Sequence, residues 1–367
     1  MKNRAEFKIE FIGIMLAALA AILIGFLVIV SISDEPINAL YYLLVEPFMS
    51  MFNFGTVLNK TVPLVLTGLA VAIVFKAGVF SMGAEGQLYI GAFFGALVAV
   101  YVDGLPALIH IPLILVTAMI GGALFGFLPG LLKGFLNVDE IVSTLMLNYV
   151  GIFTVSYLLN NVFKDPASGG YARMPYVDES GKLSRFIEGL PTHTGIFIAI
   201  LAVIVVYLYL YKTKGGYEMR LVGQNRSFAE YGGINAKWVI VKSVMAGGIL
   251  AGLAGIVEVI GVHGTLKDNF SNGLGFDGII IALLARNHPI GVLFAGFFFA
   301  YLQVGAQLMS ANSDVPRELA IIIQVLLVLF VSATAIFNYL KARHNKKVSM
   351  EQQGGAKDAR NVTGTNA

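Results

Sequence analysis

The chain has 367 residues, of which 57% are hydrophobic and only 13% are charged. A soluble domain is usually about half apolar and a quarter charged, so this composition excludes an ordinary soluble protein. The net charge of +3 indicates no particular partner and gives no reason to expect nucleic acid. The absence of cysteine excludes disulfides and thiolate metal sites.

The hydrophobic excess comes from long uncharged runs. Six of them are long enough to cross a bilayer as a helix, which takes roughly 20 residues. In chain order these runs are residues 11–33, 104–132, 141–163, 189–211, 287–313 and 319–340, and shorter candidates lie at 61–75, 86–102, 243–257 and 279–285. The sequence therefore predicts an all-α fold, a polytopic membrane helix bundle with about ten transmembrane segments.

The predicted helices follow one another with short connections. A transmembrane domain over residues 1–340 would precede a polar cytoplasmic tail, 341–367, that we expect to be disordered. The segment between the first two helices, residues 34–55, suits a short interfacial helix because it contains several aromatic residues. We expect the ten spans near 9–32, 56–76, 84–102, 111–133, 141–162, 193–211, 243–261, 279–285, 289–309 and 316–340.

Lys and Arg are concentrated in alternate connecting segments. By the positive-inside rule, this asymmetry predicts that both termini are cytoplasmic. Helices two to five would then start outside and helices seven to ten inside, which is the pattern of an inverted repeat in transporters. Each unit also has a glycine-flanked acidic residue after its first helix, in GAEGQ and in GFDG.

Polar side chains inside the apolar runs are candidates for a translocation pathway, because such groups face protein or water rather than lipid. Glu85 and Asp277 stand at expected helix starts, where a carboxylate can instead accept backbone N–H groups, and both roles remain open. Asn148 is either a link between helices or a pore residue. Capping explains Glu258 poorly, so we expect it to face a polar cavity. The further candidates are Gln87, Gln303, Gln307 and Gln324.

The sequence contains none of the common catalytic or phosphate-binding motifs, so we expect no enzymatic activity from this chain itself. Its most distinctive polar segment is the predicted cytoplasmic loop 212–242, which mixes charged and aromatic residues and suits a short helix around 225–231. Such a mixture favours docking on a protein partner. The alternative is a solvated connector.

Four separated motifs together resemble the membrane permease subunits of ATP-binding cassette (ABC) importers for simple sugars, branched-chain amino acids and, most closely, nucleosides. The resemblance covers roughly residues 50–340, in the same order and at similar spacing. The motifs are SMGAEGQLYIGA (81–92), GYEMRLVGQNRSFAEYGGINAKWVI (216–240), GGILAGLAGIVEVIG (247–261) and GFDGIIIALLARNHPIG (275–291).

The resemblance implies several partners in a bacterial plasma membrane: a cytoplasmic ABC ATPase, a second permease subunit, identical or homologous, and an extracellular substrate-binding protein. ATP and Mg²⁺ would sit on the ATPase, and this chain would bind no cofactor. The resemblance places Glu85, Gln87 and Asp277 near the solute pathway or its helix junctions. It also implies a coupling element from Gly216 to Gly233, with Glu218, Arg220, Gly223, Arg226 and Glu230 between them.

The function expected from this resemblance is import of nucleosides through a pathway driven by a separate ATPase. A simple sugar such as ribose or galactose, carried by the same mechanism, is the nearest alternative. An ion-coupled secondary transporter also uses inverted repeats and broken helices. A membrane scaffold is a third class, and it explains the buried polar groups poorly.

Overall fold

The computed structural model describes residues 23, 26–31, 33–185, 189–322 and 325–326. Most of the expected first helix and most of the tenth, together with Gln324 and the tail 341–367, therefore lie outside the described residues. The chain divides into two compact units, Met1–Tyr42 with Ala306–Ala367, and Leu43–Gly305.

In the first unit, the carboxylate of Asp314 joins two segments that are distant in sequence. Its Oδ1 accepts a hydrogen bond of 2.6 Å from the Ser33 hydroxyl, and its Oδ2 accepts one of 2.6 Å from the backbone N–H of Asp34. These bonds stabilise the charged form and lower the pKa of Asp314. The helix α2, Pro36–Leu44, begins directly after this junction.

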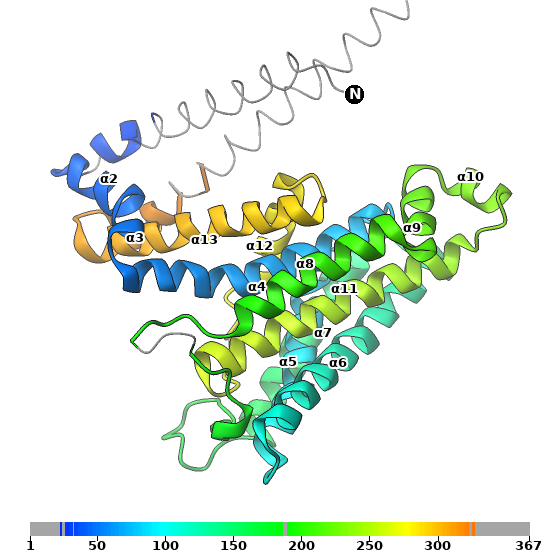
Figure 1. Cartoon of the computed structure of the whole chain (residues 1–367), viewed down its shortest axis with the longest axis horizontal. Helices are drawn as coiled ribbons and strands as arrows, with labels where there is room; N and C mark the ends of the chain where they lie inside the picture. The colour runs from blue at the N-terminus through cyan, green and yellow to red at the C-terminus, as the bar shows by residue number, and fades with distance from the viewer. Residues whose placement is uncertain (1–22, 24–25, 32, 186–188, 323–324, 327–367) are drawn as a thin grey trace, which may run out of the picture. The chain divides into compact units, whose positions relative to one another are not determined.

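The second unit is a bundle of helices (Figure 1). Apart from two isolated bridges, the described residues contain no strand. The elements are α3 Glu46–Met49, α4 Met51–Lys76, α5 Ala84–Tyr101, α6 Ala107–Leu136, α7 Glu140–Asn161, a 3₁₀ turn Glu179–Gly181, α8 Gly195–Lys212, α9 Lys214–Gln224, α10 Arg226–Tyr231, α11 Ala236–Glu258, a π-helical turn Val259–His263, α12 Leu274–Leu284 and α13 Pro289–Asn312, which continues into the first unit.

Seven helices of the described part are long and apolar enough to cross a membrane. They correspond to the predicted spans two to seven and nine, so the prediction of an all-α polytopic membrane bundle is confirmed. The predicted eighth span is α12, whose 11 residues reach roughly 16 Å, about half of a bilayer core. α11 starts at Ala236 rather than near 243, because Asn235 caps it and accepts a hydrogen bond from the Trp238 N–H.

The centre of the bundle is α11, which packs against α6, α4 and α5. Its apolar stretch is 72% buried, close to the 83% of α4 and far above the 22% of α7. Glycines allow this close packing, because a Cβ at Gly248 would overlap the Gly122 carbonyl, and one at Gly91 would overlap Gly252. Small residues at such crossings are the usual means of close helix packing in lipid, as the glycine spacing predicts.

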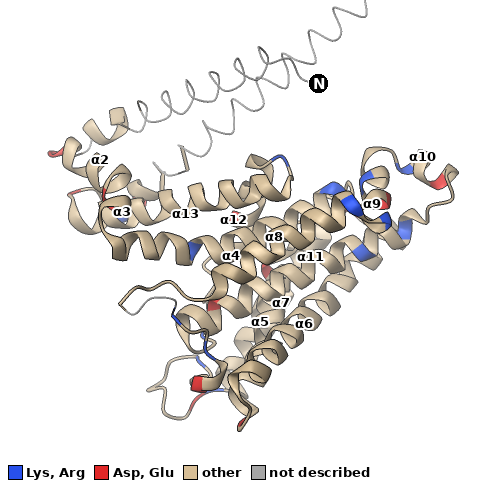
Figure 2. Cartoon of the chain, viewed as in Figure 1, with Lys and Arg blue, Asp and Glu red and all other residues tan. Residues whose placement is uncertain are grey.

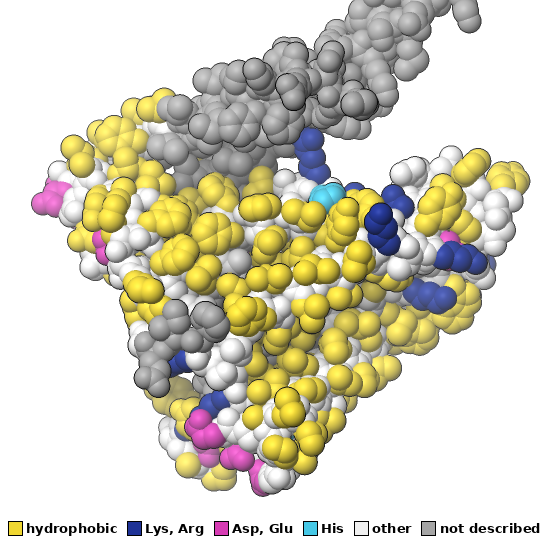
Figure 3. All heavy atoms as spheres, viewed as in Figure 1, with side chains coloured by type: hydrophobic (Ala, Val, Ile, Leu, Met, Phe, Trp, Pro, Cys, Tyr) yellow, Lys and Arg dark blue, Asp and Glu magenta, His cyan; other side chains and the backbone are white. Residues whose placement is uncertain are grey.

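The surface divides into apolar and charged parts. Hydrophobic side chains cover the visible faces of α6 and α8 (Figure 3). The exposed residues of these two helices include Leu124, Leu128, Leu201 and Val205. Lys and Arg gather around α9 and the adjacent ends of α8 and α11 (Figure 2). An apolar surface of this kind fits a lipid environment, and we call the charged end of the bundle around α9 the basic end.

One buried histidine joins three elements just before α8. The Nδ1 of His193 accepts a hydrogen bond of 3.0 Å from the Gly195 N–H, and its backbone N–H donates to Asn59 of α4 at 3.3 Å. The proton therefore sits on Nε2, which packs against Gly261 of the π-helical turn and has no partner in the described part of the chain. Burial lowers the pKa of His193 from 6.5 to about 4, so the ring is neutral at physiological pH.

This burial makes the stability of the protein dependent on pH. As the pH falls below 6.5, His193 takes up a proton in the unfolded chain before it does so in the folded one, so stability is lost progressively towards pH 4. The loss attributable to this residue is roughly 3 kcal/mol at most. Denaturant unfolding in detergent between pH 7 and pH 4 should show a shallower pH dependence for His193→Gln than for the wild type. Identical slopes would show that His193 is not held neutral.

Candidate functional site

The first side chain of the candidate site is Glu85, in the first turn of α5. It is only 3% exposed, and its Oε2 accepts a hydrogen bond of 2.6 Å from the backbone N–H of Gly275 in α12. The Ser271 hydroxyl and the Gly273 backbone also face this carboxylate. Sequence reasoning allowed Glu85 to hold the start of its own helix, but in the structure it caps the first turn of another one.

The contact requires glycine at position 275. A Cβ there would lie 2.5 Å from the Glu85 nitrogen and 2.7 Å from its Oε2, closer than packed atoms approach. The backbone of α12 therefore comes directly against the start of α5. A helix that begins inside a membrane protein needs partners for its first N–H groups, and Glu85 supplies one with a charge that suits the positive helix end.

Asn148 of α7 fixes the other side of the α5 start. Its Oδ1 accepts from the Gly86 N–H at 2.8 Å, and its Nδ2 donates to the Met82 carbonyl at 2.5 Å. The side chain is 1% exposed, so both bonds are shielded from solvent. Of the two roles considered from the sequence, this geometry is that of a link between helices. Gln87 is also buried, packs against Gly126 of α6, and its Nε2 has no hydrogen-bond partner within the described residues.

Two further acids lie along the same part of the bundle. Asp277, in the first turn of α12, accepts a hydrogen bond of 3.4 Å from Gln303 of α13 and lies within electrostatic range of Glu85 and Lys60. Glu258 ends α11, and its Oε1 is 3.5 Å from the Nε2 of His263. Lys60 acts on Glu258 as well as on Asp277. The acids of α5, α11 and α12 thus share one polar zone with a lysine from α4.

This zone does not have the composition of a metal site. Within the described residues, no three side chains of His, Asp or Glu are placed to hold one ion. The buried side chains instead supply hydrogen-bond donors and acceptors where the first turns of α5 and α12 meet. Such an arrangement holds interrupted helices in place and can line a path for a polar solute.

The predicted coupling element forms two short helices at the basic end. Gly216, Glu218, Arg220 and Gly223 lie in α9, Arg226 and Glu230 form an ion pair of 3.1 Å in α10, and Gly233 follows with φ of 81°. The expected helix at 225–231 is therefore confirmed as α10, whereas α9 was not predicted. Tyr217, Phe228 and Tyr231 are exposed on this element.

α9 is fixed to the membrane helices by backbone contacts. The Thr213 hydroxyl caps it by accepting from the Gly216 N–H at 3.2 Å, and the Arg220 guanidinium lies 5.0 Å from the Tyr211 ring centroid. At its other end, a Cβ at Gly223 would overlap the Lys76 carbonyl, and one at Gly78 would lie 2.9 Å from the Gly223 Cα. α9 therefore lies in direct backbone contact with the end of α4 and the residues that follow it.

Sequence reasoning missed several residues that complete these contacts. Gly78, with φ of 76°, receives α9, and Gly275 receives Glu85. Thr144 belongs with Asn148, because its hydroxyl accepts from the Met82 N–H at 3.0 Å. A glycine between two apolar runs does not by itself predict such a contact. Thr144 lies four residues before Asn148, and this helical spacing was the one available signal.

Several long apolar helices, interrupted helices with buried acids, and a helical element at the basic end define a polytopic membrane protein of the transporter class. Residues 53–332 match the family described as "Branched-chain amino acid transport system / permease component". The chain belongs to this family and is an ABC transporter permease. No solved structure matches it.

Three relatives share most of their length with this chain. It is 34% identical to the guanosine ABC transporter permease protein NupP of Bacillus subtilis, over 82% of this chain and 86% of the relative. It is 35% identical to the glucose ABC transporter permease protein TsgB13 of Haloferax volcanii, over 93% and 90%. It is 30% identical to the nucleoside ABC transporter permease protein NupB of Lactococcus lactis, over 94% and 97%.

Replacing Asn148 should destabilise the start of α5. Asn148→Ala removes two buried hydrogen bonds and leaves the Gly86 N–H and the Met82 carbonyl without partners. We expect the free energy of unfolding to fall by about 2–4 kcal/mol. Denaturant titration in detergent measures this loss.

Asn160→Ala is the matched control, since Asn160 lies on the same helix, is exposed and, among the described residues, bonds only to the Ser156 carbonyl. We expect the control to stay within about 0.5 kcal/mol of the wild type. Equal stability of both variants would mean that Asn148 does not fix the helix start.

Proposed function

We propose that the chain is the pathway-forming subunit of an ATP-driven nucleoside importer in the plasma membrane of a bacterium. The observation that carries the coupling role is the tight contact of Gly223 in α9 with the end of α4 at Gly78. Hydrolysis of ATP takes place on a separate subunit, which carries the nucleotide and Mg²⁺. This chain supplies the membrane path and binds no cofactor of its own.

The basic end is the cytoplasmic side in this proposal. The gathering of Lys and Arg around α9, α8 and α11 supports that orientation by the positive-inside rule (Figure 2). Both termini are then cytoplasmic, and the loop that leads from α7 to α8 is extracellular. A second permease subunit, identical or homologous, packs beside this one, and a substrate-binding protein delivers solute to the opposite end.

The ATPase subunit docks on α9 and α10 through their exposed aromatic and charged residues. Tyr217, Phe228 and Tyr231 supply the aromatic contacts, and the ion-paired Arg226 and Glu230 supply polar ones. Aromatic and Arg side chains are the usual anchors of protein interfaces. The coupling residues named from the sequence thus divide into an exposed group and two glycines, Gly216 and Gly223, that hold α9 on the bundle.

Motion of α9 reaches the candidate site through the short segment 77–83. Near the start of this segment, Gly78 is in close backbone contact with Gly223. The other end of the segment is held by Thr144 and Asn148 and lies two residues before Glu85, which binds α12. Closure of the ATPases therefore shifts the start of α5 and the α12 cap together, and so changes which side of the membrane the polar zone faces.

The two relatives that transport guanosine and nucleosides support a nucleoside as the solute. The glucose relative is as similar to this chain, and it favours a sugar as the second candidate. Both solutes are neutral ring compounds rich in hydroxyl groups. The buried amides and carboxylates of the site, Gln87, Asp277 and Glu258, suit hydrogen bonding to either of them.

Uptake measurements test the function directly. Cells with and without the gene would receive labelled guanosine, uridine, glucose or ribose, before and after ATP depletion with the membrane potential held. We expect gene-dependent uptake of the nucleosides that stops when ATP is lost. Loss of sugar uptake alone would keep the mechanism and change the solute. Uptake that follows an ion gradient instead of ATP would refute the proposal.

The contact between α9 and α4 predicts an uncoupled variant. Alanine normally favours a helix over glycine by about 1 kcal/mol, so Gly223→Ala should harm function only through its overlap with the Lys76 carbonyl. We expect ATP-dependent uptake to fall at least tenfold, because α9 can no longer lie against α4. ATP hydrolysis by the purified complex should persist.

Gly232→Ala is the control for that variant. Gly232 follows α10, and the nearest atom to an added Cβ is 3.4 Å away, so the substitution meets no obstacle. It should transport normally. Full uptake by Gly223→Ala would show that the close approach is not part of the coupling path, and loss of the ATPase subunit on purification would show that it serves docking alone.

A further inference from the structure

Two segments far apart in sequence pair at the end of the bundle opposite to α9. Residues 172–177 come from the loop between α7 and α8, and residues 264–268 from the link between α11 and α12. Backbone bonds of 2.9 Å run from Met174 to Leu266, from Val177 to Gly264 and from Asp268 to Ala172. The Thr265 hydroxyl adds a bond of 2.7 Å to the Met174 carbonyl. The pairing fixes the link although it contains little regular structure.

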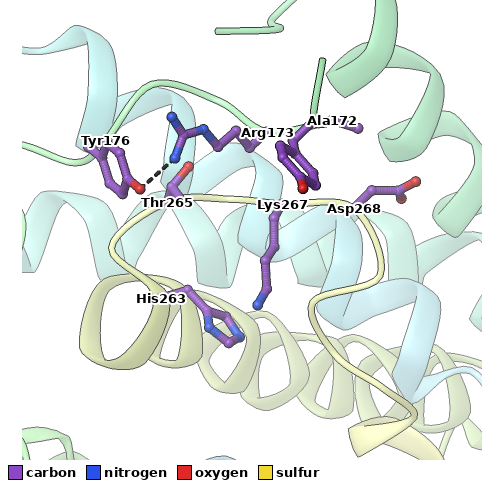
Figure 4. A pocket seen from close by; sticks show the side chains of 8 residues that line it. Ala172, Arg173, Tyr176, His263, Thr265, Lys267 and Asp268 are labelled. Atoms are coloured by element: carbon purple, nitrogen blue, oxygen red, sulfur yellow. Dashed lines mark hydrogen bonds between the residues drawn. The ribbon is translucent and has the colours of Figure 1, made fainter. Parts of the chain in front are cut away.

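A pocket of about 410 Å³ opens between the paired segments (Figure 4). This volume lies within the range of small-molecule sites, roughly 300–1,000 Å³. Its polar lining mixes donors and acceptors with aromatic rings, and includes Arg173, Tyr176, His263, Thr265, Lys267 and Asp268. The walls come from the two outer segments, and the pocket adjoins the end of α11, where Glu258 lies.

Charges of both signs lie around the pocket, and each has a polar neighbour. Arg173 pairs with Asp165 at 3.2 Å and lies over the Tyr176 ring, and Asp268 accepts from the Ser156 hydroxyl at 3.1 Å. Lys267 has no ion pair within 4 Å among the described residues, but its side chain extends towards His263 (Figure 4) and lies within electrostatic range of Glu258. A lining of this kind suits a neutral molecule with many hydroxyl groups better than a strongly charged one.

The position of the pocket relates it to the candidate site. The 264–268 link follows Glu258 and His263, which approach each other to 3.5 Å, and precedes Gly275, which Glu85 caps. A molecule in the pocket would therefore touch the stretch of chain that joins two of the buried acids to each other. The opposite end of the bound molecule would face the surface that the proposed function places outside the cell.

We propose that this pocket is the outer entry site for the transported solute, a neutral hydroxylated ring compound of the nucleoside or sugar class, with Lys267 as its principal hydrogen-bond donor. The proposal rests on the proposed function, since it takes that orientation and that class of solute. Lys267 binds a ring or ribose oxygen of the solute, and the ring of Tyr176 provides an apolar wall. The solute then passes from the pocket towards Glu258.

The test uses the complete transporter, with its ATPase and substrate-binding protein, carrying Lys267→Met or Lys182→Met. The first variant keeps the apolar stem of Lys267 and removes its ammonium group. The second is the control, because Lys182 lies in the α7–α8 loop that pairs with the 264–268 link, is not part of the pocket lining, and pairs with Glu179 at 2.5 Å. Uptake of labelled guanosine and of labelled glucose gives KM and kcat, and a pull-down titration gives the affinity for the binding protein.

We expect Lys267→Met to raise KM about tenfold for the solute that the wild type carries, with little change in kcat, because one charge-assisted hydrogen bond is lost on binding. Lys267→Arg should restore most of the loss, and Lys182→Met should behave as the wild type. The solute whose KM responds identifies which of the two classes occupies the pocket.

Two results would overturn the entry site. An unchanged KM would show that Lys267 does not contact solute. A weaker affinity for the binding protein at unchanged solute affinity would make the pocket a protein-docking surface. Failure of the proposed function is distinguishable, since wild-type cells would then show no ATP-dependent uptake of either solute before any variant is examined.

Discussion

The hydrogen bond from the Gly275 N–H to the Glu85 carboxylate is the contact on which the candidate site depends. A carboxylate in an apolar bundle is stable only where hydrogen bonds and opposite charge offset the loss of water. α12 has 11 residues and cannot cross a bilayer, so its first N–H groups would lie buried without partners. The α12 N–H group gives the buried carboxylate a hydrogen bond, and the carboxylate gives that N–H group a partner. Both depend on glycine at position 275, because a larger residue would collide with Glu85.

Direct backbone contacts at glycines also occur between other helices of the second unit. α11 meets α6 where Gly248 faces Gly122, and α9 meets α4 where Gly223 faces Gly78. Contacts between backbones are stiffer than contacts between long side chains, which can change rotamer to absorb a movement. We infer that a bundle built in this way would pass a displacement from one helix to the next with little loss. This is the mechanical property that a coupled permease needs.

The sequence predicted most of the fold because apolar length is a strong signal, and spans two to seven and nine fall close to their expected places. It also singled out Glu85, Asn148 and Asp277 as candidates, since polar residues are rare in such runs. Their partners were not predictable. α9 was missed because its sequence is polar and begins with Gly215 and Gly216 after one lysine; it is helical owing to the Thr213 cap and its packing on α8. The outer pocket depends on pairing between segments about 90 residues apart, which no local pattern reveals.

The contacts form one sequence across the second unit, from Gly223 through the 77–83 segment to Glu85, then to Gly275 and back along the link to Lys267 and Glu258. A solute bound at the outer end and an ATPase bound at the basic end would therefore act on the same junction. By linkage, a ligand that favours one arrangement of the junction changes the affinity of the other site by the same factor. In the proposed importer, solute and nucleotide would then be two ligands of a single equilibrium at the α5–α12 contact, and each would change the binding affinity of the other.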